Sequence, residues 1–243
     1  MNTKPINILG FSVDPDISNL NLDSTRVIVN TINPHSYCVT KRDHLFRETL
    51  MHSDVLIPDG IGIVLAAKIL KKGKIKKIAG ADLHAHLQKK ANDTSAKVFY
   101  LGSSTKTLTL IENRLQKDYP NIRFQTYSPP YKPSFTAEEN RAMIEAINDF
   151  NPNVLFIGMT APKQEKWAYQ NKDKINANII ASIGAVFDFY AGTVKRPGKK
   201  WQKLGLEWLP RLISEPKRLW RRTFISTPCF LKDVLIFQLC HKK

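Results

Sequence analysis

The chain has 243 residues, of which 42% are apolar, and it carries a formal net charge of +16. This length suits one large domain or a domain with an appendage, and the apolar fraction excludes wholesale disorder. The excess of cations predicts an anionic partner, namely a nucleic acid, a phosphorylated substrate or an acidic membrane surface.

The N-terminal stretch "MNTKPINILGFSVDPD" has an apolar part that is too short, and too interrupted by charges, for a signal peptide. The Asp-x-Asp in "VDPDIS" (13–18) matches the pattern with which many sugar-nucleotide enzymes hold a divalent ion. It precedes the first strand end, however, and Pro15 favours a turn. The six histidines have no metal-binding spacing. We therefore expect no metal site and no cofactor.

From residue 25 onwards, β-branched apolar runs alternate with segments of helical periodicity. Strands are expected within 25–34, 54–60, 96–104, 122–128, 153–165 and 178–192. Helices are expected within 42–53, 61–74, 107–120 and 137–152. This alternation predicts an α/β fold with a mostly parallel sheet that helices cover on both faces.

Polar residues and glycines gather where the expected strands end, in "NTINP", "IPDG", "YLGSS", "GMTAPKQE" and "GAVFDF". In open parallel sheets, ligands bind beyond the carboxyl ends of the strands. We therefore expect the functional site along this edge of the sheet.

Asp59 stands between an expected strand and an expected helix. One interpretation is a helix cap for the segment that begins at Gly60. The other is a general base at a strand end, whose pKa the helix N-terminus lowers so that it is ionised at pH 7. Gly60 and Gly62 would let a substrate approach the backbone closely. "DGIG" is not a dinucleotide-binding fingerprint, because the third glycine is missing.

Three further polar residues follow strands. Thr31 and Asn33 could satisfy loop backbone groups, or they could position a sugar or a nucleophile. Gln164 follows an apolar strand, and its own segment has no hydrophobic pattern that would explain it. Its amide could hydrogen-bond to hydroxyl groups or to the edge of a uracil base. The neighbouring Glu165 fits an acid in the first turn of a helix.

The composition changes after Gly192, so we divide the chain into an α/β domain (1–192) and a basic, aromatic appendage (193–243). The appendage interleaves cations with tryptophans, which fits a solvated face, nucleic-acid binding or docking on a membrane surface. Its apolar tail favours the membrane. No apolar run reaches about 18 residues, which predicts peripheral contact without a membrane span. The cysteines, Cys38, Cys229 and Cys240, are few and odd in number, which predicts no disulfide framework and favours a reducing cytoplasm.

Together these segments resemble the WecG/TagA/CpsF glycosyltransferase family. The resemblance covers nearly the whole chain from about residue 25 and rests on seven segments in family order. They are "NTINP", "LIPDGIGIV", "KKIAGADL" (76–83), "VFYLGSS", "GMTAPKQEKW", "SIGAVFDFYAGTVKRP" and "LGLEWLPRLISEPKRLWRR".

The resemblance implies a Rossmann-like domain whose appendage docks on the membrane and completes the active site. It implies transfer of an N-acetylmannosamine-type or related sugar from UDP to a polyprenyl-diphosphate glycolipid, at the inner face of the bacterial plasma membrane, for a surface polymer. The family's catalytic aspartate corresponds to Asp59, its active-site threonine to Thr31 and its motif glutamine to Gln164. Lys77 and Asp82 belong to "KKIAGADL", and Lys77 stands where the family often has arginine. The family's appendage arginines correspond to members of a set of four: Arg211, Arg218, Arg221 and Arg222.

From these correspondences we expect Asp59 to take the proton of the attacking acceptor hydroxyl, which gives direct displacement with inversion and without a metal. Cations of the appendage would then neutralise the leaving UDP. The alternative from another class is a non-catalytic basic module that binds nucleic acid, in which Asp59 is dispensable and binding weakens steeply with salt. An oxidoreductase is disfavoured by the missing glycine fingerprint.

Overall fold

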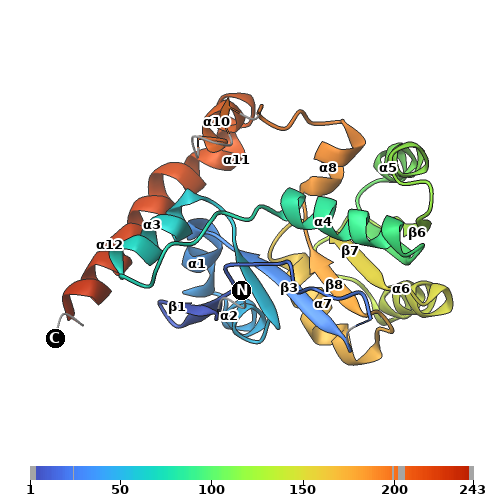
Figure 1. Ribbon diagram of the computed structural model, residues 1–243, viewed down its shortest axis with the longest axis horizontal. Helices are drawn as coiled ribbons and strands as arrows, with labels where there is room; N and C mark the ends of the chain where they lie inside the picture. The colour runs from blue at the N-terminus through green and yellow to red at the C-terminus, as the bar shows by residue number, and fades with distance from the viewer. Residues whose placement is uncertain (1–3, 24, 199, 202–205, 241–243) are drawn as a thin grey trace.

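Six parallel strands form the centre of the computed structural model, which describes residues 4–23, 25–198, 200–201 and 206–240 (Figure 1). Their spatial order is β4-β3-β8-β7-β5-β6, and every neighbouring pair is parallel. The strands are β3 (Val27–Ile32), β4 (Val55–Pro58), β5 (Lys97–Gly102), β6 (Arg123–Tyr127), β7 (Val154–Gly158) and β8 (Ile179–Ser182). The α/β fold with a parallel sheet, predicted from the sequence, is confirmed.

Helices cover both faces of the sheet because successive side chains of each strand alternate between two apolar layers. One layer packs under α4, α5 and α8, and the other under α6 and α7. A third apolar cluster joins α2 and α3 to the β4 edge. The helices of this part are α1 (Pro34–Thr40), α2 (His44–Met51), α3 (Ile61–Ile69), α4 (Gly80–Asp93), α5 (Thr105–Asp118), α6 (Ala137–Phe150), α7 (Lys163–Asn171) and α8 (Val186–Ala191).

The N-terminal segment forms a short antiparallel hairpin, β1 (Ile6–Ile8) and β2 (Phe11–Val13), which the sequence did not predict. The chain then crosses to the edge of β4. There Asp14 N donates to Leu56 O, and Leu56 N donates to Asp14 Oδ2, both at 2.8 Å. Asp16 accepts from Ser18 N at 3.0 Å. The two aspartates of "VDPDIS" thus have separate local partners.

After α8, which Gly192 follows in the left-handed conformation, the chain leads to the side of the molecule away from α5 and α6 (Figure 1). There it forms α10 (Trp208–Ser214), α11 (Pro216–Arg221), the π-helical turn η2 (Arg222–Ser226) and α12 (Thr227–Cys240). We keep the name appendage for the residues after 192. The division of the chain at this residue stays a prediction.

The appendage attaches to the domain mainly through α12. Phe230 and Val234 are fully buried in the cluster of α2 and α3, and the Phe230 ring meets Tyr37 of α1 at 5.1 Å. Asp233 pairs with Lys41 at 2.7 Å and accepts from Tyr37 Oη at 3.1 Å. These contacts lay α12 along the surface of the domain.

One helix of this region bears on the expectation that no apolar run is long enough to span a membrane. Leu219–Cys240 is a continuous helix that is long and apolar enough, by length and composition, to cross a membrane. The sequence did not indicate such a segment because scattered charges interrupt the apolar run, whereas the structure joins α11, η2 and α12 without a break.

Candidate active site

A cavity of about 1460 Å³ opens at the carboxyl ends of the strands, between the sheet and the appendage. Nine residues that the sequence predicts as site residues line it: Thr31, Asn33, Asp59, Gly60, Gly62, Lys77, Gln164, Arg211 and Arg222. Asp82 and Arg221 do not line it. The side chain of Arg218 lies outside the described part of the chain.

Asp59 is placed by the sheet. Its backbone N–H donates to Ile32 O at 2.9 Å, which continues the ladder between β3 and β4. Ile78 N donates to Pro58 O at 2.9 Å, so the segment that carries Lys77 runs beside the end of β4. Asp59 does not cap α3. The cap residue is Gly60, at φ 97°, and no side chain donates or accepts there.

The predicted effect of the helix on Asp59 is wrong, because the pKa of Asp59 is raised. Burial in the cavity is the largest cause. Lys77 and Arg211 oppose it, while Glu207 and Asp82 add to it. Desolvation of the carboxylate therefore outweighs the N-terminus of the nine-residue helix α3. A carboxylate with a raised pKa is a stronger base, and among the described residues this one has no side-chain hydrogen bond that would occupy it.

An ion-pair network crosses from the domain to the appendage beside Asp59. Glu207 Oε2 accepts from Lys77 Nζ at 2.5 Å, and Glu207 Oε1 accepts from Arg196 Nε at 3.0 Å. Arg196 Nη2 reaches Asp82 Oδ1 at 3.3 Å. Burial raises the pKa of Glu207, but the hydrogen bonds from the two cations outweigh it and leave that pKa lowered. The Glu207 carboxylate is thus ionised and holds Lys77 next to the cavity.

This network accounts for the role of Asp82 and adds two residues to the candidate site. Asp82 Oδ2 also accepts from Ala79 N at 2.9 Å and so caps α4, which makes its role here structural. Arg196 and Glu207 line the cavity although the sequence analysis did not select them. Both lie in segments that resemble the family, "TVKRP" and "GLEW", and a charged residue within such a segment is the signal that could have found them.

The side chains of Thr31 and Asn33 differ in how available they are to a ligand. Thr31 belongs to β3, opposite Ile57 of β4, and its side chain lines the cavity. The Asn33 side chain caps α1, since its Oδ1 accepts from His35 N at 3.0 Å and from Ser36 N at 2.9 Å. The structure therefore supports the local-cap interpretation for the Asn33 oxygen.

Glycine stands at positions 60 and 62 for two different structural reasons. Gly60 adopts a positive φ that L-residues rarely tolerate. A Cβ at Gly62 would stand 2.4 Å from Pro34 Cγ, so glycine is needed there for the packing of α3 against the start of α1. This packing brings the helices after β3 and β4 together behind Thr31 and Asp59.

Gln164 and Glu165 form the first turn of α7 and are 4% and 3% exposed. Gln164 Oε1 accepts from Met159 N at 3.2 Å, and Gln164 Nε2 donates to Glu165 Oε1 at 2.9 Å. Burial raises the pKa of Glu165 to about 7, although Gln164, Arg222 and Lys166 oppose the shift. Glu165 is in the first turn of a helix, as the sequence suggested, and it is also buried beside Gln164.

The appendage closes the cavity on its outer side. Arg222 of η2 lines it next to His35, whose Nδ1 lies 2.9 Å from Ser226 Oγ. Burial and the charge of Arg222 lower the pKa of His35 to about 4, so this imidazole is neutral at pH 7. Arg211 of α10 reaches the cavity with its guanidinium 5.1 Å from the Phe189 ring.

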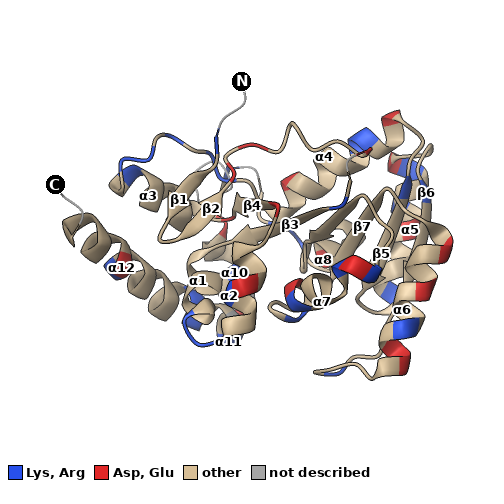
Figure 2. Ribbon diagram, turned by 90° about the horizontal axis from the view of Figure 1, so that it is seen from below, with Lys and Arg blue, Asp and Glu red and all other residues tan. Residues whose placement is uncertain are grey.

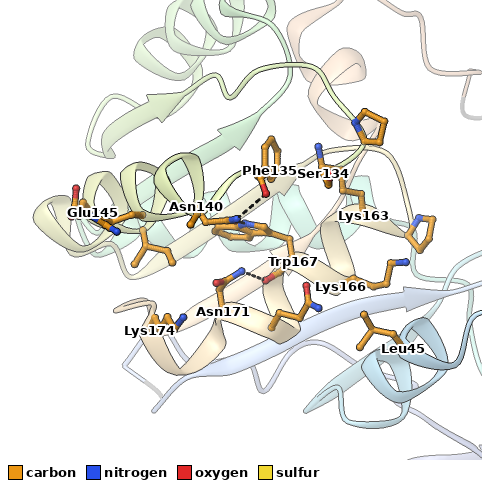
Figure 3. A pocket seen from close by; sticks show the side chains of 16 residues that line it. Leu45, Ser134, Phe135, Asn140, Glu145, Lys163, Lys166, Trp167, Asn171 and Lys174 are labelled. Carbon is orange, nitrogen blue, oxygen red and sulfur yellow. Dashed lines mark hydrogen bonds between the residues drawn. The ribbon is translucent and has the colours of Figure 1, made fainter.

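A second pocket, of about 1020 Å³, lies between α6 and α7 (Figure 3). Trp167 forms its floor and donates from Nε1 to Asn140 Oδ1 at 2.7 Å. None of the site residues predicted from the sequence lines this pocket. The cavity around Asp59 is therefore the candidate active site.

Comparison with known proteins shows the family of the chain. The model of the glycosyl transferase WecG/TagA/CpsF family matches residues 7–243. An N-acetylglucosaminyldiphosphoundecaprenol N-acetyl-beta-D-mannosaminyltransferase of Bacillus spizizenii is 30% identical, over 97% of this chain and 91% of its own. Proteins with the same name from Bacillus subtilis and Staphylococcus aureus strain MW2 are each 28% identical, over 86% and 96% of this chain and 78% and 93% of theirs. The chain belongs to the WecG/TagA/CpsF family of glycosyl transferases.

Proposed function

We propose that this family member transfers N-acetylmannosamine or a related sugar from UDP to a polyprenyl-diphosphate-linked glycolipid during synthesis of a bacterial cell-surface polymer. The names of its relatives support an N-acetylmannosaminyl group and an acceptor of N-acetylglucosamine on diphosphoundecaprenol. The observation that carries the proposal is Asp59, a carboxylate of raised pKa within a large cavity that cations also line. The volume exceeds what one small ligand needs, so it has room for both substrates.

Asp59 is the general base of a single displacement. It takes the proton of the acceptor hydroxyl while that oxygen forms a bond to the anomeric carbon of the donor. The bond between this carbon and the β-phosphate oxygen breaks, and UDP leaves with the electron pair. Attack opposite the leaving group inverts the anomeric configuration. Thr31 and Gln164, which line the same cavity, orient the sugar hydroxyl groups.

Side-chain cations stabilise the leaving diphosphate. Among the described residues, six of them line the cavity: Lys77, Lys132, Lys163, Arg196, Arg211 and Arg222. Their fixed positive charges act where negative charge develops in the transition state, which is the role that a divalent ion has in other transferases. We therefore propose a reaction that persists in the presence of a chelator.

The surface that carries α12 and α3 binds the cytoplasmic face of the plasma membrane. Large apolar side chains are exposed along α11 to α12, at Trp220, Phe224, Ile225, Leu235, Ile236 and Leu239, and on α3 at Ile61 and Leu65. Figure 2 shows cations on the segment that follows α3, where Lys71, Lys72, Lys74 and Lys76 are all exposed. Apolar side chains beside cations fit an anionic lipid surface, where each cation contributes about 1 kcal/mol.

The proposed function is tested by UDP release from a panel of UDP-sugars, with and without a polyprenyl-diphosphate-N-acetylglucosamine acceptor and in the presence of EDTA. We expect acceptor-dependent release from one donor and a product of inverted anomeric configuration by NMR. Release that requires added metal would overturn only the proposal that side-chain cations take the place of a divalent ion. Absence of release from every donor, with a folded protein and a verified acceptor, would overturn the transferase.

A further inference from the structure

The Glu165 carboxyl is buried and lies next to the side-chain amide of Gln164. Gln164 has its Oε1 occupied by Met159 N and one Nε2 proton by Glu165 Oε1. The amide also packs against Gly184, where a Cβ would stand 3.4 Å from Oε1 and 3.5 Å from Nε2. One Nε2 proton is left for a ligand, and its direction is set by these three contacts.

Glu165 belongs to the wall of the cavity, but its carboxyl is almost wholly buried. The residue is 3% exposed, and its Oε2 is buried without a hydrogen-bond partner among the described residues. Among the described residues, the side-chain hydrogen bond that this carboxyl makes is the one it accepts from Gln164, which links it to the amide in the cavity. An amide held on one side by a backbone N–H and on the other by a carboxylate cannot flip, because a flip would oppose its oxygen to that carboxylate.

The charged groups around Glu165 come from three elements. Lys166 lies on α7 itself and pairs with Asp43 at the start of α2 at 2.8 Å, and Arg222 lies on η2 of the appendage. The sheet side offers neutral groups, because Asn30 of β3 and Ser182 of β8 lie on the face that α7 covers. The appendage thus supplies one of the two cations that favour the ionised form of this carboxyl.

We propose that Glu165 is a positioning residue of the transferase: its carboxylate fixes the Gln164 amide so that the free Nε2 proton points at a donor oxygen in the cavity. This role rests on the proposed function. An ionised acceptor makes the hydrogen bond from Gln164 about twice as strong as a neutral one does. Burial brings the pKa of Glu165 to about 7, so the amide is held firmly above this pH and loosely below it. Arg222 lowers that pKa and so links docking of the appendage to the order of the donor site.

A double-mutant cycle on the Michaelis constant of the sugar donor tests the role. Gln164→Ala and Glu165→Ala should each raise KM by about tenfold, as expected for loss of a charge-assisted hydrogen bond. In the Gln164→Ala background, Glu165→Ala should add less than about twofold, since its effect passes through the missing amide. Equal effects in both backgrounds, or no effect of Glu165→Ala, would overturn the proposal. Glu145→Gln, a substitution on α6 outside the active-site cavity, is the matched control.

Glu165→Gln is the second variant, in case Glu165→Ala fails to fold. Its side-chain amide keeps an oxygen that can accept the hydrogen bond from Gln164. In the wild type, KM for the donor should rise as pH falls through about 7, whereas it should stay flat in Glu165→Gln. The acid limb of kcat, which reports Asp59, should remain in both. A KM profile identical in the two proteins would contradict the proposal.

A measurement without substrate separates this proposal from the proposed function. The side-chain amide resonance of Gln164, identified by its loss in Gln164→Ala, should titrate near pH 7 in the free wild type. It should not titrate in Glu165→Gln, and in Arg222→Ala the titration should move to higher pH. The amide of Gln170, which is exposed on the same helix, serves as the internal reference. An unchanged Gln164 resonance between pH 6 and pH 8 would overturn the positioning role even if the enzyme is an active transferase.

Discussion

The two sides of the cavity are held in different ways. On the domain side, Asp59 and Thr31 continue the hydrogen-bonded ladder of buried strands, and Gln164 is itself buried. On the appendage side, Arg211 and Arg222 sit on short helical segments, which are fastened by ion pairs and by one buried face of α12. The groups that perform chemistry are therefore as stable as the sheet, whereas the groups that neutralise charge depend on a contact that can open separately. This separation would let the membrane control the reaction without disturbing the base.

The sharpest test of the domain side is Asp59→Asn, which removes the base and keeps its shape. We expect kcat to fall by about 10²–10⁴-fold, which is the usual contribution of a general base. The free energy of unfolding should not decrease, because the variant no longer buries a charge. Acceptor-dependent UDP release and urea unfolding measure the two quantities. Full turnover in this variant would leave Asp59 without a catalytic role.

The two faces of α12 should respond oppositely. Phe230→Ala removes a fully buried ring from the contact with α1 and should cost about 3–5 kcal/mol of unfolding free energy. Leu239→Gln, at a side chain that is 68% exposed, should leave stability within about 0.5 kcal/mol. It should instead weaken sedimentation with anionic vesicles. If Leu239→Gln binds vesicles as the wild type does, the proposed membrane surface is misplaced.

The appendage side is tested by Arg222→Ala. Loss of a preorganised cation at the leaving group should lower kcat/KM by about 10²-fold on a water-soluble acceptor. Lys217→Ala, an exposed cation on α11 outside the cavity, is the control and should stay within about twofold. Similar losses in both variants would indicate a general effect of charge and would remove the distinction between the two cations.

The smallest effect is a shift of the pH profile. Lys77 lowers the pKa of Asp59 and Glu207 raises it. A base with a raised pKa loses activity as pH falls through that pKa, so the acid limb of kcat reports it. Lys77→Gln should move this limb to higher pH, and Glu207→Gln should move it to lower pH. Shifts in the same direction would show that the network acts through structure and that its charges have no direct effect on Asp59.

Much of the fold was readable because apolar periodicity is a local property. The strands around Val29, Val98 and Val154 were expected where they lie, as were the helices around Ile111 and Ile147. The hairpin at Phe11 was missed, since two strands of three residues have too little length for a pattern. Helix α4, with a mixed polar sequence after Gly80, was missed for the same lack of a clear period.

By itself, the sequence determined the parallel α/β sheet, the edge at which polar groups collect and the place of Asp59, Thr31 and Gln164 along it. It did so because strand periodicity and strand order place chain segments without reference to distant partners. Only the tertiary structure decided what each polar group is free to do. It committed the Asn33 oxygen to a cap, raised the pKa of Asp59 and buried Glu165 behind Gln164. Burial and charge depend on neighbours far away in the chain, such as Glu207 beside Lys77, and no local pattern contains them.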